Sequence, residues 1–301
     1  MIYSIGSIFL DHIIKIDSFP KNPIKIIAKG IEKRLGGSAA VASFTIKKLG
    51  QNTSFVGRLG DDDASKFLIG ELDRFKITYK NSIVIKGTQS SQSYVYEDVK
   101  GERLLAAFNE KKLLNYNKLP KISFTNNNTY MADLRWVAAT LYVSKNCFIN
   151  NLNFIVDLDN YKLDSKIKQI VKQASHPIFS ETGAIEFTKS RSIISSLKKM
   201  SSIKKKFYAI TAGKKGVFWI ENGTVYNCQP PKIKAVETNC AGDVFHGAFA
   251  MFIHKKNSIS DSMKLATATA TLKCTKKGGI YSLPSYSAVK KFAKKIEVRK
   301  L

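Results

Sequence analysis

Short apolar runs alternate with segments of helical periodicity along most of the chain, and this alternation constrains the fold more than any other feature. The apolar run at residues 1–10 is followed by a helix-like segment at 39–49 that Gly50 ends. Further strand-like runs follow later in the chain, at residues 129–132, 154–156, 177–179 and 208–210. Such alternation is typical of an α/β fold with a mainly parallel sheet, which we therefore expect.

Residues 83–108 depart from this alternation. Several short strand-like runs follow one another there, and a turn at Lys100-Gly101 separates the last two. Residues 12–34 also alternate between apolar and polar side chains and could supply further strands. A small sheet beside a large α/β domain often acts as a lid. We predict one domain over residues 1–301, with lid strands from about 12–34 and 83–108.

The formal net charge of +26 raises the question of an anionic partner, such as a nucleotide, an acidic metabolite, nucleic acid or a membrane surface. The basic residues are mostly lysines spread over the whole chain, so a compositional bias explains most of the charge. The chain has no interleaved basic and aromatic motif and no run approaching the ~18 apolar residues of a membrane helix. We therefore expect a small-molecule substrate, and neither nucleic acid nor a membrane as partner.

The cysteines and the N-terminal segment favour a cytoplasmic location. The four cysteines are scattered and form no CxxC pair, so reduced thiols are the simpler interpretation. The N-terminal segment lacks a basic stretch, and Asp11 interrupts its apolar run. We interpret this segment as a first strand and not as a signal peptide.

Residues 237–248 carry the strongest chemical signal. A turn of small residues leads directly into a helix-like run, so a ligand can approach the backbone closely. The free N–H groups and the positive dipole end of a helix form an anion site. Asp243 lies at the mouth of this site, where its carboxylate could take a proton from an attacking hydroxyl during phosphoryl transfer. An ordinary helix N-cap is the alternative role for Asp243.

Other catalytic signatures are absent from the sequence. The chain contains no GxxxxGK[ST] loop, and it also lacks the HExxH, GxSxG and GxGxxG patterns. The four histidines are scattered without metal-ligand spacing, so we expect structural or surface roles for them. The sequence therefore names no metal-binding residue.

Four motifs in the same order resemble those of the ribokinase (phosphofructokinase-B) family of carbohydrate kinases. The family's D-T-x-G-A-G-D signature stands here as residues 237–243, and its N-terminal glycine motif as residues 36–40. A G-x-x-G-D-D motif matches residues 57–62, and the T-x-G-x-x-G nucleotide loop matches residues 211–216. Together these motifs span nearly the whole chain.

The resemblance implies a fold and a mechanism. The fold would be a ribokinase-like three-layer α/β/α domain with a mainly parallel sheet and a small β-sheet lid. The activity would be ATP-dependent phosphorylation of a sugar hydroxyl, with Asp243 as the catalytic base. The backbone of Cys240, Ala241 and Gly242 would build the anion hole.

The resemblance also implies binding residues and cofactors. Mg²⁺ would accompany ATP, and members of the family often bind a monovalent cation such as K⁺ near the anion hole. Lid strands of the family can pair across a homodimer. The residues implied along ATP are Thr211, Gly213 and Gly216, and those implied at the sugar hydroxyls are Asp11, Gly36 and Gly37.

Two departures from the family pattern matter. Cys240 replaces the first glycine of the G-A-G-D turn, although its backbone N–H remains. The family's N-x-x-E motif, which is linked to metal and phosphate binding, stands here as Ser-Glu-Thr-Gly at residues 180–183. The turn is expected to stay functional, and the way in which the metal is held is left open.

A narrower resemblance points to the bacterial sulfofructose kinase branch. The segments that carry it are residues 90–93, 100–103, 132–136, 179–181 and 272–275. Lys25 and Arg135 fall at the branch's sulfonate-binding lysine and arginine, but Ala107 stands where the branch has an asparagine, which leaves nearby Asn109 as a replacement. Two cations could anchor an anionic sugar tail. Alternatively, Lys25 is a solvated lid lysine and Arg135 a structural ion-pair member.

The leading hypothesis is an ATP-dependent kinase of a ketose-type sugar, which could be sulfonated or otherwise anionic. A nucleoside kinase of the same family is one alternative, in which Tyr94, Tyr96 and Phe108 would stack on a base. A catalytically weak sugar or nucleotide sensor is a second alternative, favoured by Cys240 and by the altered motif at 180–183.

Overall fold

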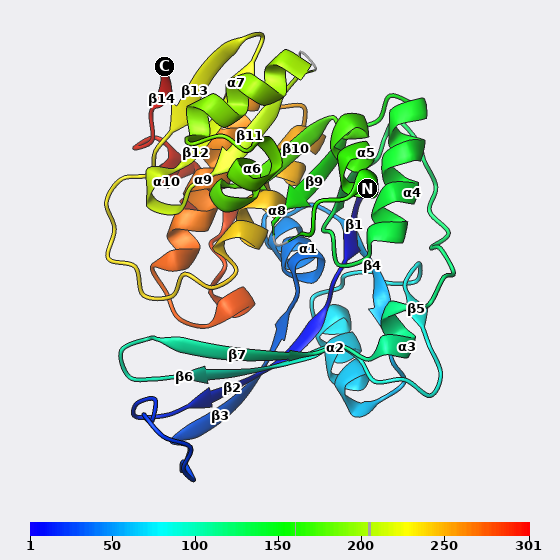
Figure 1. The fold of residues 1–301 in the computed structure, drawn as a ribbon, viewed down its shortest axis with the longest axis vertical. Coiled ribbons are helices and arrows are strands. Elements are labelled where there is room, and N and C mark those ends of the chain that lie inside the picture. The colour runs from blue at the N-terminus through cyan, green and yellow to red at the C-terminus, as the bar shows by residue number, and fades with distance from the viewer. Residues whose placement is uncertain (160, 204–205) are drawn as a thin grey trace.

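The computed structural model describes residues 1–159, 161–203 and 206–301. A ten-stranded sheet forms its centre and has the order β14-β13-β12-β11-β10-β9-β8-β1-β4-β5 (Figure 1). The strands from β5 to β11 are parallel, whereas β12, β13 and β14 add in antiparallel pairs. The strand bounds are β1 Ile2–Gly6, β4 Thr53–Leu59, β5 Ile83–Val84, β8 Thr129–Ala132, β9 Phe154–Leu158, β10 His176–Ser180, β11 Tyr208–Thr211, β12 Val217–Glu221, β13 Thr224–Cys228 and β14 Val298–Lys300.

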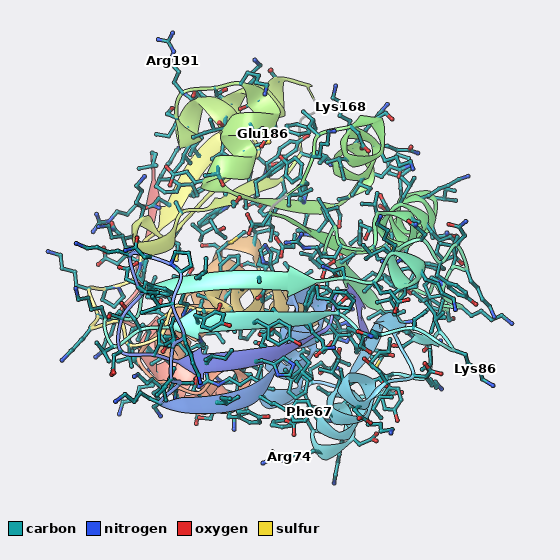
Figure 2. All side chains as sticks on the ribbon, turned by 60° about the horizontal axis from the view of Figure 1, so that its bottom comes forward. Phe67, Arg74, Lys86, Lys168, Glu186 and Arg191 are labelled. Carbon is teal, nitrogen blue, oxygen red and sulfur yellow. The ribbon has the colours of Figure 1, made fainter. Side chains whose placement is uncertain are left out.

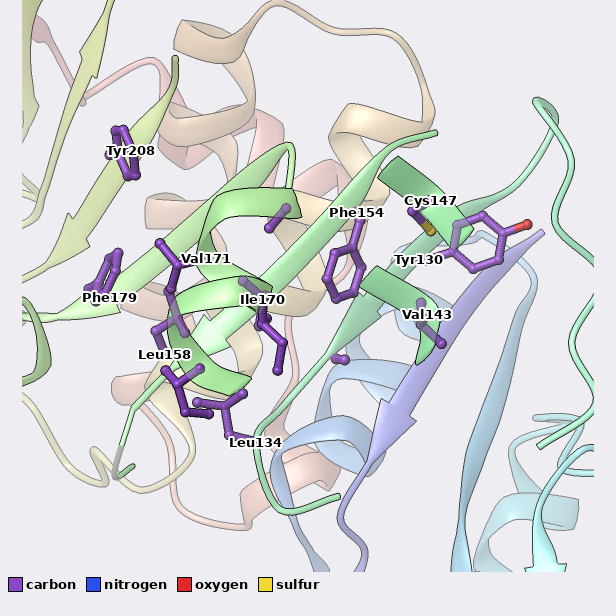
Figure 3. Packing of buried hydrophobic residues seen from close by; sticks show 14 of the residues in the cluster. Tyr130, Leu134, Val143, Cys147, Phe154, Leu158, Ile170, Val171, Phe179 and Tyr208 are labelled. Carbon is purple, nitrogen blue, oxygen red and sulfur yellow. The ribbon is translucent and has the colours of Figure 1, made fainter. Parts of the chain in front are cut away.

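Helices cover both faces of this sheet, as expected for a mainly parallel sheet. One face carries α4 Val137–Ile149, α5 Ser165–Gln173, α6 Glu181–Thr188 and α7 Ile193–Ile203, which share one apolar cluster with the sheet. Figure 3 shows part of this cluster, where Phe154 of β9 lies between Val143 of α4 and Ile170 of α5. The other face carries α1 Ser38–Lys48, α2 Asp63–Arg74, α8 Ala241–His254, α9 Ile259–Cys274 and α10 Tyr286–Ala293.

A separate four-stranded sheet, here called the lid sheet, has the order β3-β2-β6-β7. Its strands are β2 Phe9–Lys15, β3 Gly30–Gly36, β6 Gln92–Glu97 and β7 Arg103–Phe108. It extends from one side of the main domain at the bottom of Figure 1, and Figure 2 looks onto it. The short helix α3 (Lys111–Leu114) leads from β7 back to the main domain. The predicted three layers and small second sheet are confirmed.

One part of the lid prediction is wrong. Residues 83–85 were expected in the small sheet, but Ile83 and Val84 form β5 and pair in parallel with Arg58 and Leu59 of β4. The N–H of Ile85 continues this pairing to the carbonyl of Leu59. A two-residue strand has no periodicity of its own, so only its neighbour in space decides which sheet it joins.

Local sequence signals fixed several element boundaries. The side chain of Asp62 caps α2 by accepting from the N–H of Ser65, 3.0 Å away. The hairpin between β12 and β13 turns at Asn222 and Gly223, both with positive φ, as the Asn-Gly pair predicts. Over the described ranges, no helix has the length and apolarity needed to cross a membrane.

Candidate active site

The motifs predicted to act together meet at the carboxyl ends of the parallel strands, on the side of the main domain that faces the lid sheet (Figure 1). Helix α1 begins directly after Gly37, and α8 begins after Cys240. The two helices pack closely, because Gly247 of α8 lies against the backbone of Ala42 in α1. A Cβ atom on Gly247 would stand 2.6 Å from the Ala42 carbonyl oxygen. Two segments about two hundred residues apart in the sequence thus present their helix N-termini side by side.

Asp243 lies in the first turn of α8 and keeps partial access to solvent. Burial raises the pKa of its carboxyl to about 6, and the nearby charge of Asp157 adds to this rise, while a hydrogen bond from Ser38 and the charge of His246 act in the opposite direction. A carboxylate with such a proton affinity can accept a proton near neutral pH. The environment therefore suits a base better than an ordinary helix cap.

The turn that leads into α8 has a strained backbone at Cys240. This residue adopts φ 59° and ψ 12°, the left-handed region in which glycine is favoured. The family's glycine at this position thus has a conformational reason, and the chain keeps the same turn with a side chain in place. Burial raises the pKa of the Cys240 thiol, and the charge of Asp243 raises it further, so the thiol stays protonated.

The lid sheet contributes Asp11 from β2. Its Oδ1 accepts a 2.5 Å hydrogen bond from the hydroxyl of Ser93 on β6, and burial raises its pKa. Gly36 leaves room for this carboxylate, since a Cβ there would stand 2.1 Å from Asp11 Oδ2. Gly37 has φ 94° and no room for a side chain against Ile8. The charges of Asp11 and Asp243 both act on the Cys240 thiol, so the two carboxylates face one turn.

Asp133, for which the sequence predicted no role, follows β8 and connects several segments of this region by hydrogen bonds. Its Oδ2 accepts from the N–H and the hydroxyl of Ser7, at 2.8 and 2.6 Å, and from the N–H of Ala39, at 3.2 Å. Its Oδ1 accepts from the N–H of Arg135. A Cβ on Gly6 would overlap the same carboxylate. The sequence signal that could have identified Asp133 is an acidic residue directly after a buried strand.

Arg135 is exposed and borders two pockets. The first also contains Arg58, whose guanidinium stacks 5.0 Å from the ring of Trp136. Its other polar lining includes Ser7, Ser91 and Asn109. The second pocket is lined by Arg135 together with Tyr161, Thr182, Gly183 and Glu186, and Figure 2 labels Glu186 on α6.

The predicted nucleotide residues surround the end of β11. Thr211 is the last residue of this strand, and its hydroxyl donates to the carbonyl of Phe179 on β10. Gly213 and Gly216 both have positive φ and flank a short 3-10 turn, η1 (Gly213–Lys215). A Cβ on Gly216 would stand 2.1 Å from the Cys228 carbonyl oxygen, so this loop requires a glycine.

Some predicted residues do not join the site. Lys25 lies in the exposed loop at 16–29 between β2 and β3, and it does not border either pocket that Arg135 lines. Tyr94 pairs with His12, one residue after the pair formed by Asp11 and Ser93. Successive strand residues point to opposite faces, so Tyr94 faces away from Asp11.

The same register applies to the two other rings proposed to stack on a base. Tyr96 is two residues after Tyr94 on β6, and Phe108 of β7 pairs with Gln92, so all three share a face. That face is opposite the one that carries Asp11. The structure therefore speaks against a base-stacking surface made by these rings on the face of the lid sheet that carries Asp11.

A profile described as pfkB family carbohydrate kinase matches residues 1–286. The chain belongs to the pfkB family of carbohydrate kinases. It is 24% identical to a ribokinase of Lactococcus lactis subsp. lactis over 299 residues, covering 98% of this chain and 97% of that one. It is 23% identical to a fructokinase of Vibrio alginolyticus, covering 92% and 95%.

The fold of this pfkB-family chain is shared by solved structures. A ribokinase from Thermotoga maritima superposes with a TM-score of 0.82 at 23% identity, covering 97% of this chain and 99% of that one. Arabidopsis thaliana ribokinase complexed with ribose and ATP gives 0.83 at 22% identity, covering 97% and 98%. The prediction of an ATP-dependent sugar kinase is confirmed at the level of the family. The sulfofructose kinase branch stays a prediction.

Proposed function

We propose that this kinase transfers the γ-phosphoryl group of ATP to a hydroxyl of a ketose-type sugar, with Asp243 as the base. The observation that carries the proposal is the position of Asp243, which stands at the N-terminus of α8 with its pKa raised to about 6 and near the lid carboxylate of Asp11. Asp243 would remove the hydroxyl proton as the oxygen attacks the phosphorus atom.

The turn at the start of α8 would stabilise the transferring group. Backbone N–H groups of Cys240, Ala241 and Gly242 and the positive end of α8 favour negative charge at this place. Asp11 and the backbone at Gly36 would hold the sugar hydroxyls, and the lid sheet would keep water away from the reacting oxygen. Thr211 and the η1 turn would lie along the nucleotide.

Mg²⁺ fits the carboxyl end of β9. Asp157 is buried there, its Oδ1 has no hydrogen-bond partner among the described residues, and its charge acts on Asp243. Within those residues no three His, Cys, Asp or Glu side chains form a metal-ligand cluster. Mg²⁺ in kinases is held by one or two carboxylates, water and the phosphates, whose charge it neutralises. We therefore assign Asp157, in place of the missing N-x-x-E motif, as the carboxylate toward Mg²⁺.

An anionic substituent on the sugar is supported by the two arginines of the first pocket. Arg58 and Arg135 border the same space as Ser7, close to the sugar site, and Asn109 adds an amide to its wall. Arg58 already donates from both terminal nitrogens to the carbonyl oxygens of Leu114 and Arg135, so it adds positive charge to the pocket. The exposed guanidinium of Arg135 is the group that could bind sulfonate, phosphate or carboxylate oxygens through paired hydrogen bonds. Lys25 would add to this recognition only if the 16–29 loop moved toward the pocket or a second copy supplied it.

A homodimer through the lid sheet is supported by its exposed apolar residues. Strand β7 forms an edge of the sheet and is exposed along its whole length, with Leu104 at 60% and Leu105 at 59% exposure. Ile31 on the opposite edge strand is 67% exposed. Apolar edge strands of this kind are templates for pairing with another chain.

The test is ADP release from Mg-ATP with fructose, sulfofructose, fructose 6-phosphate, ribose and adenosine as acceptors. We expect turnover of one sugar, and Asp243→Asn should lower kcat by about 10²- to 10⁴-fold, the range for loss of a general base. Asp63→Asn is the matched control, because Asp63 occupies the first turn of α2 and is exposed. Undiminished turnover in Asp243→Asn would refute the assigned base, and ATP binding without any transfer would favour the sensor.

A further inference from the structure

Lys273 in the last turn of α9 is fully buried, and its ammonium group is surrounded by oxygen atoms. It donates to the carbonyl oxygen of Glu237 at 3.2 Å, to Glu237 Oε1 at 3.1 Å and to the carbonyl oxygen of Asn239. A lysine ammonium carries three N–H groups, so these three acceptors satisfy it completely. The group is thus a cation held by two main-chain carbonyls and one carboxylate.

The charge of this ammonium is balanced by Glu237. Burial by itself would raise the pKa of Glu237, but the N–H of Gly278 and the charges of Lys273 and Arg34 outweigh it and lower the pKa to about 2. Its Oε2 accepts from Gly278 and Arg34, and its Oε1 from Gly279 and Lys273. A buried charge persists only when it is paired and hydrogen-bonded in this way.

These oxygens lie directly behind the anion hole. Asn239 immediately precedes Cys240, whose backbone makes the left-handed turn into α8. Two carbonyls only two residues apart point at the same ammonium, although carbonyl dipoles aimed at one point repel each other without a cation between them. Lys273 therefore holds the turn from Glu237 to Cys240 in the shape from which α8 begins.

The K⁺ implied by the family resemblance does not fit this arrangement. A hard cation beside the turn would take carbonyl and carboxylate oxygens, and the ammonium of Lys273 already occupies those of Glu237 and Asn239. The residue at 237 also differs from the family signature, since glutamate replaces aspartate. The longer side chain reaches the N–H groups of Gly278 and Gly279 while it still contacts the ammonium.

We propose that Lys273 is a built-in cation that replaces an exchangeable monovalent ion behind the anion hole, so that neither folding of this turn nor turnover requires K⁺. Lys273 is a positioning residue, because it acts on the reaction through the backbone of residues 237–240. The statement about turnover rests on the proposed kinase function, whereas the statement about the turn does not.

The first experiment uses the wild-type protein and needs no variant. Turnover and melting temperature are measured in tetramethylammonium chloride and again in KCl at the same ionic strength. We expect both quantities to be the same in the two salts. An increase of turnover or melting temperature that is specific for K⁺ would overturn the proposal, because it would reveal an exchangeable ion site.

The second experiment removes the built-in cation while leaving its oxygens in place. Lys273→Ala should lower the melting temperature and reduce kcat by about a hundredfold in tetramethylammonium chloride, the scale for loss of one oxyanion-hole donor. K⁺, NH₄⁺ or a short alkylammonium ion should restore part of both losses. The recovery of turnover should appear mainly in kcat, with a smaller change in KM. Lys273→Arg, which keeps a cation, should be less impaired than Lys273→Ala.

Met263→Ala is the matched control on the same helix, since Met263 is fully buried in an apolar cluster on α9, ten residues before Lys273, and carries no N–H or O–H group. It should be destabilised without regaining stability or turnover from K⁺. Folded Lys273→Ala that responds to the cations no more than Met263→Ala does would overturn the proposal. If no sugar is turned over by the wild type, the kinase proposal fails separately, and the K⁺-dependent melting temperature of Lys273→Ala still decides the role of Lys273.

Discussion

The contact between α1 and α8 allows a stability prediction with an internal control. In Gly247→Ala the new Cβ would stand 2.6 Å from the carbonyl oxygen and 2.8 Å from the Cα of Ala42. Both neighbours are backbone atoms, so no rotamer change relieves the overlap and the helices must separate by roughly 1 Å to reach ordinary contact. Overpacking of this kind costs about 1–3 kcal/mol. The higher helix propensity of alanine offsets about 1 kcal/mol of this cost.

Gly70→Ala supplies the control, because Gly70 lies inside α2, is exposed and has no atom within 4 Å of the place that a Cβ would take. It gains the same propensity without the overlap and should raise the free energy of unfolding by about 1 kcal/mol. Taking the upper part of the overpacking range for a backbone contact, Gly247→Ala should lower it by about 1–2 kcal/mol. The two variants should therefore differ by about 2–3 kcal/mol.

Chemical denaturation with equal m-values, supported by thermal melting, measures this difference. For a chain of 301 residues, with an unfolding entropy of about 2.1 cal/mol/K per residue, the gap corresponds to a separation of about 3–5 °C between the two melting temperatures. Gly247→Ala should also lose turnover, since the N-termini of α1 and α8 carry the two halves of the proposed site. A Gly247→Ala protein as stable as Gly70→Ala would refute the close approach of the two helices and the argument built on it.

Four further predictions concern the site and the lid sheet. The kcat/KM of the wild type should fall as the pH drops through about 6, because Asp243 is then protonated; a profile that is flat from pH 5 to 8 would contradict its role as base. The free energy of unfolding should fall as the pH rises from 3.8 to about 6, because native Asp243 still binds a proton that the unfolded chain has released. Asp243→Asn should therefore be more stable than the wild type at pH 8 but not at pH 3. Cys240→Gly should be more stable than Cys240→Ala by about 1 kcal/mol and should keep its turnover, because only glycine relieves the left-handed φ of 59°; equal denaturation midpoints would show that the turn is not strained. Leu104→Lys together with Leu105→Glu should convert a dimer to a monomer in sedimentation velocity, and an unchanged sedimentation coefficient would exclude an interface at β7.

The sequence by itself determined the fold class and predicted most of the residues of the candidate site. Alternating periodicity gave the parallel sheet between two helical layers, because the side-chain period of each element is set by its own residues. Local sequence was also sufficient to predict the glycines at 36–37, 213 and 216 and the turn before Asp243. Positive φ or the absence of a side chain is required there by the backbone of a few neighbouring residues.

Tertiary structure alone decided the contacts that join distant segments. No local sequence pattern predicts the pairing of β5 with β4 or the hydrogen bonds that Asp133 accepts from Ser7 and Ala39. The same is true of the hydrogen bonds from the Lys273 ammonium to Glu237 and Asn239. A buried lysine and a solvated one look the same in a sequence with 49 basic residues. Whether its charge is exposed to water or held by Glu237 and Asn239 depends on which atoms the folded chain places around it, and that is fixed only when α9 packs against the turn that leads into α8.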